Sequence, residues 1–347
     1  MNSILAYLED HYQRLELDRI GLPKRMSAIM ITPRFHASSH VLFLIFPKGE
    51  TNPNLVVKIP RLIEASGGLR REIENLRLVQ GIRTEGFDSI PRVHSVDEVE
   101  GRLLLIESAL VGKPMDPAEV RRNPTLNCSR LINWLVEVQN ASRISSEDQP
   151  DWYIKMVEDP LNYFLERFPV NPQEESLISQ TREILAMLRT TNLPLVFEHG
   201  DLSHPNVLVL ENNGVGVVDW EQAEPKGQPG ADLFFFLTYV AFALHKSHDK
   251  GRFLPAFQSA FFTHEAWASK YILDYAERIE LPFFALTPLF ILCWFRYMTG
   301  ILKRLSHAQS DTYKFGSDTA KWLRGNRYYT LWKYSVNHEK EITWGLN

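Results

Sequence analysis

The stretch HGDLSHPNVLVLENNGVGVVDWE, residues 199–221, constrains the fold of this chain more than any other segment. It contains two short apolar runs, at 207–210 and 215–218, and the step Asn213-Gly214 lies between them. Such a step between apolar runs predicts a β-hairpin, because the tight turns that match twisted strands need residues that tolerate positive φ. Polar residues stand at both outer ends of this predicted hairpin.

The two polar residues at the ends of the hairpin are Asn206 and Asp219. With the turn centred on Asn212 and Asn213 they lie opposite each other, and a turn one residue later makes them a diagonal pair. Either register predicts a separation of about 5–8 Å between the side chains. An amide oxygen and a carboxylate at that separation are hard oxygen ligands, which Mg²⁺ prefers together with water and phosphate oxygens. The hairpin therefore predicts a magnesium site.

Asp201 lies five residues before Asn206 in the same stretch. A carboxylate in this position that is not used by the metal can accept a proton from a hydroxyl nucleophile. One loop and one hairpin thus predict a general base, two metal ligands and space for a polyphosphate.

The rest of the chain changes in character near residue 107. Before it, four strand-like runs and one or two helical patterns predict a small α+β lobe. After it, long helical patterns predominate and predict a larger, mainly helical lobe that contains the hairpin. We therefore predict a bilobed α+β chain with an N-terminal lobe at 1–107 and a C-terminal lobe at 108–347. The expected strands are 28–31, 41–46, 55–59 and 103–106, and the expected helices are 3–17, a segment after Gly68, 126–138, 161–168, 177–188, 234–244 and 283–305.

Composition excludes several classes of protein. The net charge of −4 argues against general nucleic-acid binding. The two cysteines have neither disulfide-framework nor metal-site spacing, and the N-terminal segment carries acidic residues within its apolar pattern, unlike a secretion signal. The uncharged run 281–295 is shorter than the roughly 20 residues of a membrane span. These features predict a cytoplasmic protein without a membrane span, and they carry no signal of oligomeric state.

The polar residues of the 199–221 stretch resemble the catalytic and metal-binding loops of kinases. They are most similar to those of the aminoglycoside phosphotransferase and choline kinase-like superfamily, which read HGD-x-x-x-x-N followed by DW-E. Here these are His199-Gly200-Asp201, Asn206 and Asp219-Trp220-Glu221. The resemblance implies a protein-kinase-like fold, with Asp201 as catalytic base and Asn206 and Asp219 as Mg²⁺ ligands. It also implies that Glu221 supports the metal or the substrate and that His199 shapes the loop.

A kinase-like fold needs a phosphate-binding lysine on a strand of the N-terminal lobe. Lys58 stands in the run 55–59, where a lysine is unusual. Its partner should be a glutamate on the following helix, either Glu72 or Glu74. Glu72 lies roughly 60° from the apolar stripe of that helix and Glu74 about 140° from it. We therefore predict that Glu72 pairs with Lys58 and that Glu74 faces solvent.

The resemblance also implies ATP, or another nucleoside triphosphate, and Mg²⁺ as cofactors. Residues 104–110 resemble the strand and hinge between kinase lobes, so the backbones of Glu107 and Ala109 are expected to contact adenine. The loop between the first two strands lacks the glycine-rich motif of protein kinases, and we assign its Ser38 and Ser39 to the triphosphate. Asp232 matches a family aspartate after the metal loop and is expected to be structural.

We predict a phosphotransferase that acts on a small-molecule hydroxyl, because the Ala-Pro-Glu signature of protein-kinase activation segments is absent. The candidate acceptors are an aminoglycoside, choline or ethanolamine, a sugar or lipid-linked sugar, or an amino-acid alcohol. Residues 147–224 hold 15 acidic and 4 basic residues. This imbalance favours a cationic acceptor, unless it only reflects solvated helix faces.

Two other classes stay open. One is a non-catalytic nucleotide-binding module that kept the fold, against which the intact Asp201 argues. The other is a metal-dependent hydrolase in which His199, Asp201, His204 and Asp219 hold zinc. The second alternative leaves the strand lysine and its helix glutamate unexplained.

Overall fold

The computed structural model describes residues 2–32, 40–62, 66–247, 252–263, 265–306 and 314–344. The chain divides into two compact units, the first comprising Met1–Met115 and His204–Pro225 and the second Asp116–Ser203 and Lys226–Asn347. The predicted combination of a sheet-based N-terminal lobe and a mainly helical C-terminal lobe is confirmed. The predicted triphosphate residues Ser38 and Ser39 lie outside the described residues.

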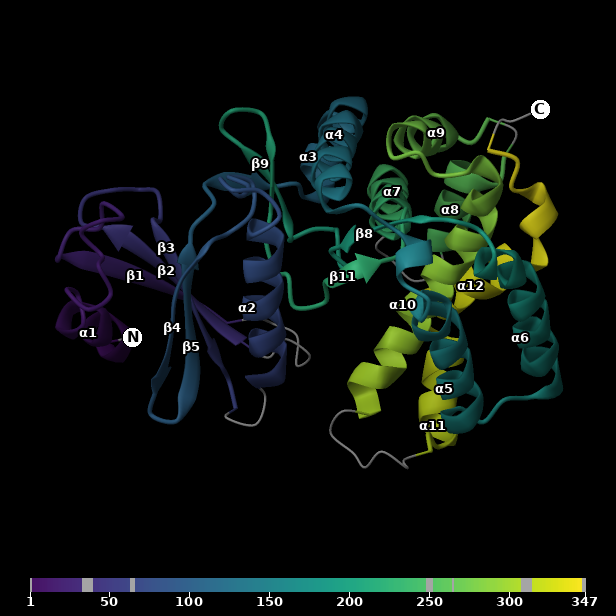
Figure 1. The fold of residues 1–347 in the computed structure, drawn as a ribbon, viewed down its shortest axis with the longest axis horizontal. Coiled ribbons are helices and arrows are strands. Elements are labelled where there is room, and N and C mark those ends of the chain that lie inside the picture. Colours follow the sequence, from purple (N-terminus) through teal and green to yellow (C-terminus); the bar gives the residue numbers. More distant parts are fainter. Residues whose placement is uncertain are drawn as a thin grey trace. The chain divides into compact units, whose positions relative to one another are not determined.

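The first unit is built on a five-stranded antiparallel sheet (Figure 1). Its strands are β1 (Met26–Ile31), β2 (His40–Pro47), β3 (Leu55–Pro60), β4 (Val93–Val99) and β5 (Arg102–Ser108), in the order β1-β2-β3-β5-β4. All four strands expected from apolar runs are present. The sequence does not predict β4, because this strand reads VHSVDEV and nearly all of its residues are only partly buried.

Helix α2 (Ser66–Gln80) lies against one face of this sheet and contacts β3, β4 and β5 (Figure 1). Its buried side carries Leu69, Ile73 and Leu76, as its apolar spacing predicts. Glu72 is also buried on this side, whereas Glu74 is exposed, so the predicted orientation of the two glutamates is confirmed.

Helix α1 (Asn2–Asp10) packs its apolar side into a hydrophobic cluster with residues of β2, β3 and β5. The predicted helix 3–17 is too long, because the helix ends at Asp10 and irregular turns follow it. Glu16 has a φ of 49°, a left-handed conformation that an α-helix excludes. Leu15 is nevertheless buried in the same cluster. The apolar spacing thus identified the buried residues but not the end of the helix.

The predicted hairpin is present in the first unit as β9 (Val207–Leu210) and β10 (Val215–Val217). On its other side β9 pairs with β6 (Gly112–Pro114), which gives a three-stranded sheet. The N–H of Asn213 donates to the carbonyl oxygen of Leu210 at 3.0 Å, and Asn213 has a φ of 63°. Asn213 therefore occupies the left-handed position that closes a three-residue hairpin loop.

The register of the hairpin differs from both predicted registers. The N–H of Val218 donates to the carbonyl oxygen of Asn206 at 3.0 Å, so Asn206 lies opposite Val218. Neither the directly opposite nor the diagonal arrangement of Asn206 and Asp219 is found, because the connection has three residues, Glu211 to Asn213. Asp219 is the residue after Val218, so it directly follows the residue that pairs with Asn206 at the open end of the hairpin.

The second unit is mainly helical, and α7 and α10 form much of its interior. Helices at all five expected positions after residue 114 are present. A small sheet of order β11-β8-β7 leads into the 199–201 loop. The helices are α3 (Pro117–Arg122), α4 (Pro124–Ser142), α5 (Asp159–Arg167), α6 (Pro172–Leu185), α7 (Ala231–Leu244), α8 (Phe253–Phe261), α9 (Ser269–Arg278), α10 (Leu286–Ser306), α11 (Ser317–Arg324) and α12 (Arg327–Asn337), and the strands are β7 (Ile144–Ser145), β8 (Pro194–Glu198) and β11 (Glu224–Gly227).

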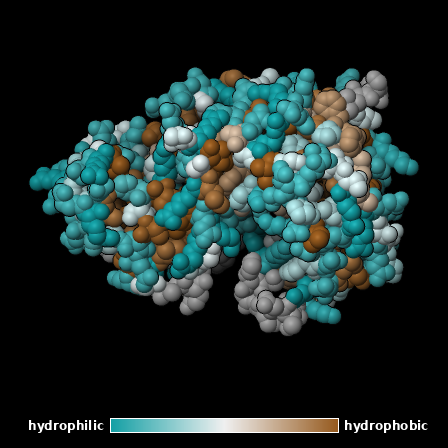
Figure 2. Space-filling view, viewed as in Figure 1, coloured by the Kyte–Doolittle hydropathy of each residue, from teal (hydrophilic) through white to brown (hydrophobic). Residues whose placement is uncertain are grey.

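Among the residues that the structure describes, one apolar stretch, Phe283–Leu305, is long enough to cross a membrane and has a mean hydropathy of 1.4. In the structure 72% of its most apolar 18-residue segment is buried, as in the core helix of a globular protein. Figure 2 shows hydrophilic residues over most of the visible face, with hydrophobic residues in small separate patches. Scattered patches of this kind are normal on protein surfaces and need no further explanation.

Candidate functional site

Lys58 lies on β3 with only 5% of its surface exposed. Its Nζ atom is 2.5 Å from Oε1 of Glu72, which α2 presents to the sheet. The predicted pairing of Lys58 with Glu72 is therefore confirmed. A buried lysine needs such a partner, because desolvation makes an unpaired buried charge costly.

Glu107 also pairs with Lys58, which the sequence analysis did not anticipate. Oε1 of Glu107 is 2.9 Å from Nζ of Lys58, and Glu107 is 1% exposed. The register of the sheet explains the contact. Lys58 pairs with Leu105 on β5, and Glu107 lies two residues further along, on the same face as Leu105. Alternation along β5 places Glu107 on the same face as Leu105, but only the register of β5 against β3 brings it to Lys58.

The electrostatics of this cluster depend on burial and on three carboxylates. Burial lowers the pKa of Lys58, whereas the charges of Glu107, Glu72 and Asp219 raise it. The charges have the larger effect together, so the pKa lies above its ordinary value. Burial raises the pKa of Glu107 to about 7, although the Lys58 charge opposes this. Lys58 is thus a permanent cation in an acidic environment.

The segment that contains Asp219 is held against α2. Asn75 donates from Nδ2 to the carbonyl oxygens of Trp220 at 2.8 Å and Ala223 at 3.1 Å. The N–H of Trp220 donates to Oε1 of Glu72 at 3.3 Å. Asp219 itself has a φ of 69°, the left-handed conformation. Asn75 is not among the residues predicted from the sequence, although it occupies the buried side of α2, where a polar residue is unusual.

Glu221 and Asn206 complete the predicted residues of the first unit. His40 Nδ1 lies 3.8 Å from a carboxylate oxygen of Glu221, and Arg71 Nε donates to the Glu221 carbonyl oxygen at 3.4 Å. Asn206 is buried at the start of β9. The N–H of Ala109, predicted to contact adenine, donates to the carbonyl oxygen of Asn54 at 3.0 Å.

Within the part of the chain that the structure describes, no group of three or more His, Cys, Asp or Glu side chains could hold a metal ion. The zinc-hydrolase alternative therefore gains no support. The amide of Asn206 and the carboxylate of Asp219 are a different kind of donor set, made of hard oxygens only. Such a set suits Mg²⁺, which keeps several waters and shares phosphate oxygens with its substrate.

Asp201 lies in the second unit, in the loop after β8. The N–H of Asp201 donates to Nδ1 of His199 at 3.2 Å, as expected if His199 shapes the loop. The carboxylate of Asp232 accepts from the N–H of His199 at 2.8 Å and from that of Gly200 at 2.9 Å. Gly200 has a φ of 81°, which favours glycine. The expected structural role of Asp232 is confirmed, since it holds the backbone beside Asp201.

Glu198, Gln228 and Arg296 form a polar network close to Asp232. Arg296 donates from Nη1 to both carboxylate oxygens of Glu198, at 2.9 and 2.7 Å. Gln228 N–H also donates to Glu198, at 2.8 Å, and its side chain donates to the carbonyl oxygen of Leu289 at 2.6 Å. Burial and the Glu198 charge raise the pKa of Asp232 to about 7, against the effect of its backbone donors. Two buried acids and one partly buried arginine therefore support the loop.

One tyrosine of α10 and one of α12 lie close enough to Asp201 to be influenced by its charge. Burial raises the pKa of both Tyr297 and Tyr328, and the charge of Asp201 adds to each shift. The rings of Phe235 and Tyr297 stack, with centroids 4.2 Å apart. Neither tyrosine is predicted from the sequence, and Tyr328 comes near Asp201 only because α12 packs against α10.

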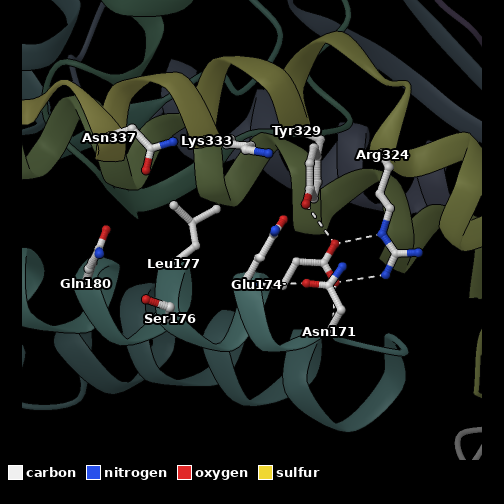
Figure 3. Close-up of a pocket in the computed structure, with 10 residues that line it drawn as sticks. Asn171, Glu174, Ser176, Leu177, Gln180, Arg324, Tyr329, Lys333 and Asn337 are labelled. Carbon is white, nitrogen blue, oxygen red and sulfur yellow. Dashed lines mark hydrogen bonds and ion pairs between the residues drawn. The ribbon is translucent and has the colours of Figure 1, made fainter.

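A pocket of about 410 Å³ lies in the second unit between α6 and helices α11 and α12, away from the predicted site residues (Figure 3). Glu174 is its buried acid, and it accepts from Arg324 at 2.8 Å and from the hydroxyl of Tyr329 at 2.7 Å. The same carboxylate accepts from the N–H of Asn171 and completes a capping box for α6. The pairing of Glu174 thus joins α6 to α11 and α12, and none of the predicted site residues lines this pocket.

Comparison with known proteins agrees with this geometry. The model of the phosphotransferase enzyme family matches residues 37–271. No curated protein matches the chain. Among solved structures, choline kinase LicA from Streptococcus pneumoniae is similar at 12% identity, with a TM-score of 0.50 over 96% of this chain and 100% of that one.

Two further structures are similar over most of their length. A putative fructosamine-3-kinase from Haemophilus somnus has 14% identity and a TM-score of 0.47, over 93% of this chain and 95% of that one. An aminoglycoside phosphotransferase from Streptomyces rimosus has 14% identity and a TM-score of 0.41, over 81% and 98%. The family match spans well over half of the sequence. The chain therefore belongs to the phosphotransferase enzyme family.

Proposed function

We propose that this protein is an ATP- and Mg²⁺-dependent phosphotransferase that transfers the γ-phosphoryl group to a hydroxyl of a small molecule. The observation that carries the proposal is the buried ion pair between Lys58 and Glu72 in a chain of this family. A lysine with 5% exposure is costly to bury, and a phosphate-binding role accounts for it.

The nucleotide is assigned to groups of the first unit. Lys58 would donate to phosphate oxygens, with Glu72 holding its ammonium in place. The backbone of Glu107 and the carbonyl oxygen of Ala109 would contact the base, since the Ala109 N–H already bonds to Asn54. Ser38 and Ser39 would contact the triphosphate.

Asn206 and Asp219 would hold Mg²⁺, with Glu221 in support of the metal or the substrate. Their amide and carboxylate oxygens are the ligand types that this ion prefers. When bound, the ion offsets negative charge on the phosphate oxygens. Asn75 and Glu72 keep the backbone after Asp219 in place through their bonds to Trp220.

Asp201 would act as the general base. Its carboxylate accepts the proton of the acceptor hydroxyl as that oxygen forms a bond to the γ-phosphorus. The bond between the γ-phosphorus and the bridging oxygen breaks, and the products are ADP and a phosphate ester. Asp232 positions Asp201 through its bonds to His199 and Gly200.

The acceptor is proposed to be a cationic alcohol, such as an amino sugar or an amino alcohol. Residues 147–224 carry an excess of acidic residues, and Tyr297 and Tyr328 lie within reach of the Asp201 charge. Acidic and aromatic surfaces both attract organic cations. A cytoplasmic location belongs to the same proposal, because both cysteines are free and buried.

The first test is turnover by the purified wild-type chain. We expect ATP consumption that is stimulated by at least one alcohol in a panel of aminoglycosides, amino alcohols and sugars, and that is lost when EDTA removes Mg²⁺. The measurement is ADP release by a coupled assay, with phosphorylation of the acceptor confirmed by mass spectrometry. Binding of ATP without turnover across the whole panel would instead support the non-catalytic nucleotide-binding module.

A further inference from the structure

Lys58 is shared by two buried carboxylates. Its Nζ lies 2.5 Å from Oε1 of Glu72 and 2.9 Å from Oε1 of Glu107. A lysine ammonium has three N–H donors, so these two contacts leave one donor for any further acceptor. All three side chains are at most 6% exposed, so water competes little for these bonds. The hydrogen-bonding capacity of Lys58 is largely occupied within the first unit.

The cluster carries more negative than positive charge. Glu72 and Glu107 face one ammonium, and the Asp219 charge also acts on Lys58. His40 interacts electrostatically with Lys58 and Glu72, and Glu221 and Arg71 in turn act on His40, whose pKa burial lowers. Nothing else in the described surroundings of Lys58 supplies a second buried cation to balance Glu107.

Glu107 has an oxygen that the protein does not satisfy. Its Oε2 is buried and has no hydrogen-bond partner among the described residues. Buried polar atoms are satisfied in the great majority of cases, so an exception calls for a reason. An ionised carboxylate with one unpaired oxygen is costly in this position, whereas a protonated carboxyl group is less so. The pKa of about 7 for Glu107 agrees with this geometry.

A phosphate oxygen that binds to Lys58 comes close to the carboxylate of Glu107. The incoming oxygen takes the remaining N–H donor and places a second negative charge beside Glu107. Like charges that share a site raise the pKa of the acid among them. Binding of the phosphate therefore favours the protonated form of Glu107, and ionised Glu107 opposes binding.

We propose that Glu107 is a second positioning residue for Lys58, which opposes binding of the nucleotide phosphate while it is ionised and permits binding when it takes up a proton. This proposal rests on the proposed phosphate-binding role of Lys58. Glu107 on β5 thus restrains the Lys58 ammonium in addition to Glu72 on α2.

The test compares MgATP binding by the wild type and by Glu107→Gln, using calorimetry at pH 6 and pH 8. For a group with a pKa of about 7 that binds a proton with the ligand, the wild-type Kd should rise about tenfold from pH 6 to pH 8. Glu107→Gln keeps the shape and an acceptor oxygen for Lys58 but cannot ionise. Its Kd should change little with pH relative to the wild type, and it should bind about tenfold more tightly than the wild type at pH 8.

The matched control is Glu74→Gln, which removes an exposed carboxylate from the same helix as Glu72. It should reproduce the pH dependence of the wild type. Titration of ATP itself and of His40 affects every variant alike. The ratio of the Kd values of wild type and Glu107→Gln at each pH therefore reports the effect of Glu107 ionisation alone. A purely structural role of Glu107 would weaken binding by the same factor at both pH values.

Equal pH dependence in wild type and Glu107→Gln would overturn the role of Glu107 and leave the proposed function standing. Absence of MgATP binding by the wild type at both pH values would instead reject the proposed function, and this inference with it. If Glu107→Gln does not fold, proton uptake on MgATP binding to the wild type at pH 7.5, measured in buffers of different ionisation enthalpy, decides the question. Uptake of most of one proton supports the proposal, and uptake near zero overturns it.

Discussion

Replacing Asp201 by asparagine is expected to lower kcat for phosphoryl transfer about 10²–10⁴-fold, the usual contribution of a general base. Asparagine has nearly the same shape but cannot accept the hydroxyl proton. The bonds that hold the loop do not use the Asp201 side chain, so the loop should keep its conformation. The backbone N–H of Asp201 donates to Nδ1 of His199, and Asp232 accepts from the two preceding backbone N–H groups. The measurement is kcat with saturating MgATP and the best acceptor from the panel.

The Kd for MgATP is expected to stay within about threefold of the wild-type value, because the proposed nucleotide contacts of Lys58 are unchanged. Glu211→Gln is the matched control, since this exposed acid lies in the same stretch but in the hairpin turn. It should retain full activity. Unchanged kcat in Asp201→Asn would show that Asp201 is not the base. Loss of MgATP binding together with kcat would point to a structural role for this residue.

Replacing Arg296 by methionine is expected to lower the free energy of unfolding of the second unit by about 3–5 kcal/mol. Arg296 donates to both oxygens of Glu198, whose side chain is 6% exposed. Its removal leaves the Glu198 charge buried beside Asp232, whose pKa Glu198 already raises. The measurement is urea denaturation followed by circular dichroism, in which the transition of the second unit should move to lower urea.

The control for this prediction is Arg304→Met on the same helix, α10, because Arg304 is exposed. A surface substitution of this kind should change the unfolding free energy by less than about 0.5 kcal/mol. The double variant Glu198→Leu with Arg296→Met should recover part of the loss, because it leaves no unpaired buried charge. Equal stability of Arg296→Met and Arg304→Met would contradict the importance of the buried pair.

Local patterns were enough to predict a large part of the fold and of the candidate site. The Asn213-Gly214 step and the apolar runs beside it predicted the hairpin, and the angular position of Glu72 on its helix predicted the pairing with Lys58. Both predictions depend on residues close together in sequence or on the 3.6-residue period of a helix. The family followed from the spacing of Asp201, Asn206 and Asp219, which is also a local property.

Tertiary structure alone decided the remaining features, because they depend on contacts between distant segments. The second carboxylate on Lys58 comes from the register of β5 against β3, which no local pattern specifies. Asn75 and Asp232 acquire their roles only when α2 meets residues 220–223 and α7 meets the loop after β8. The sequence by itself thus determined which residues carry the chemistry, since short-range spacing encodes their order along helices and turns. Packing decided which buried charges share a partner, since desolvation acts on neighbours in space and not on neighbours in the chain.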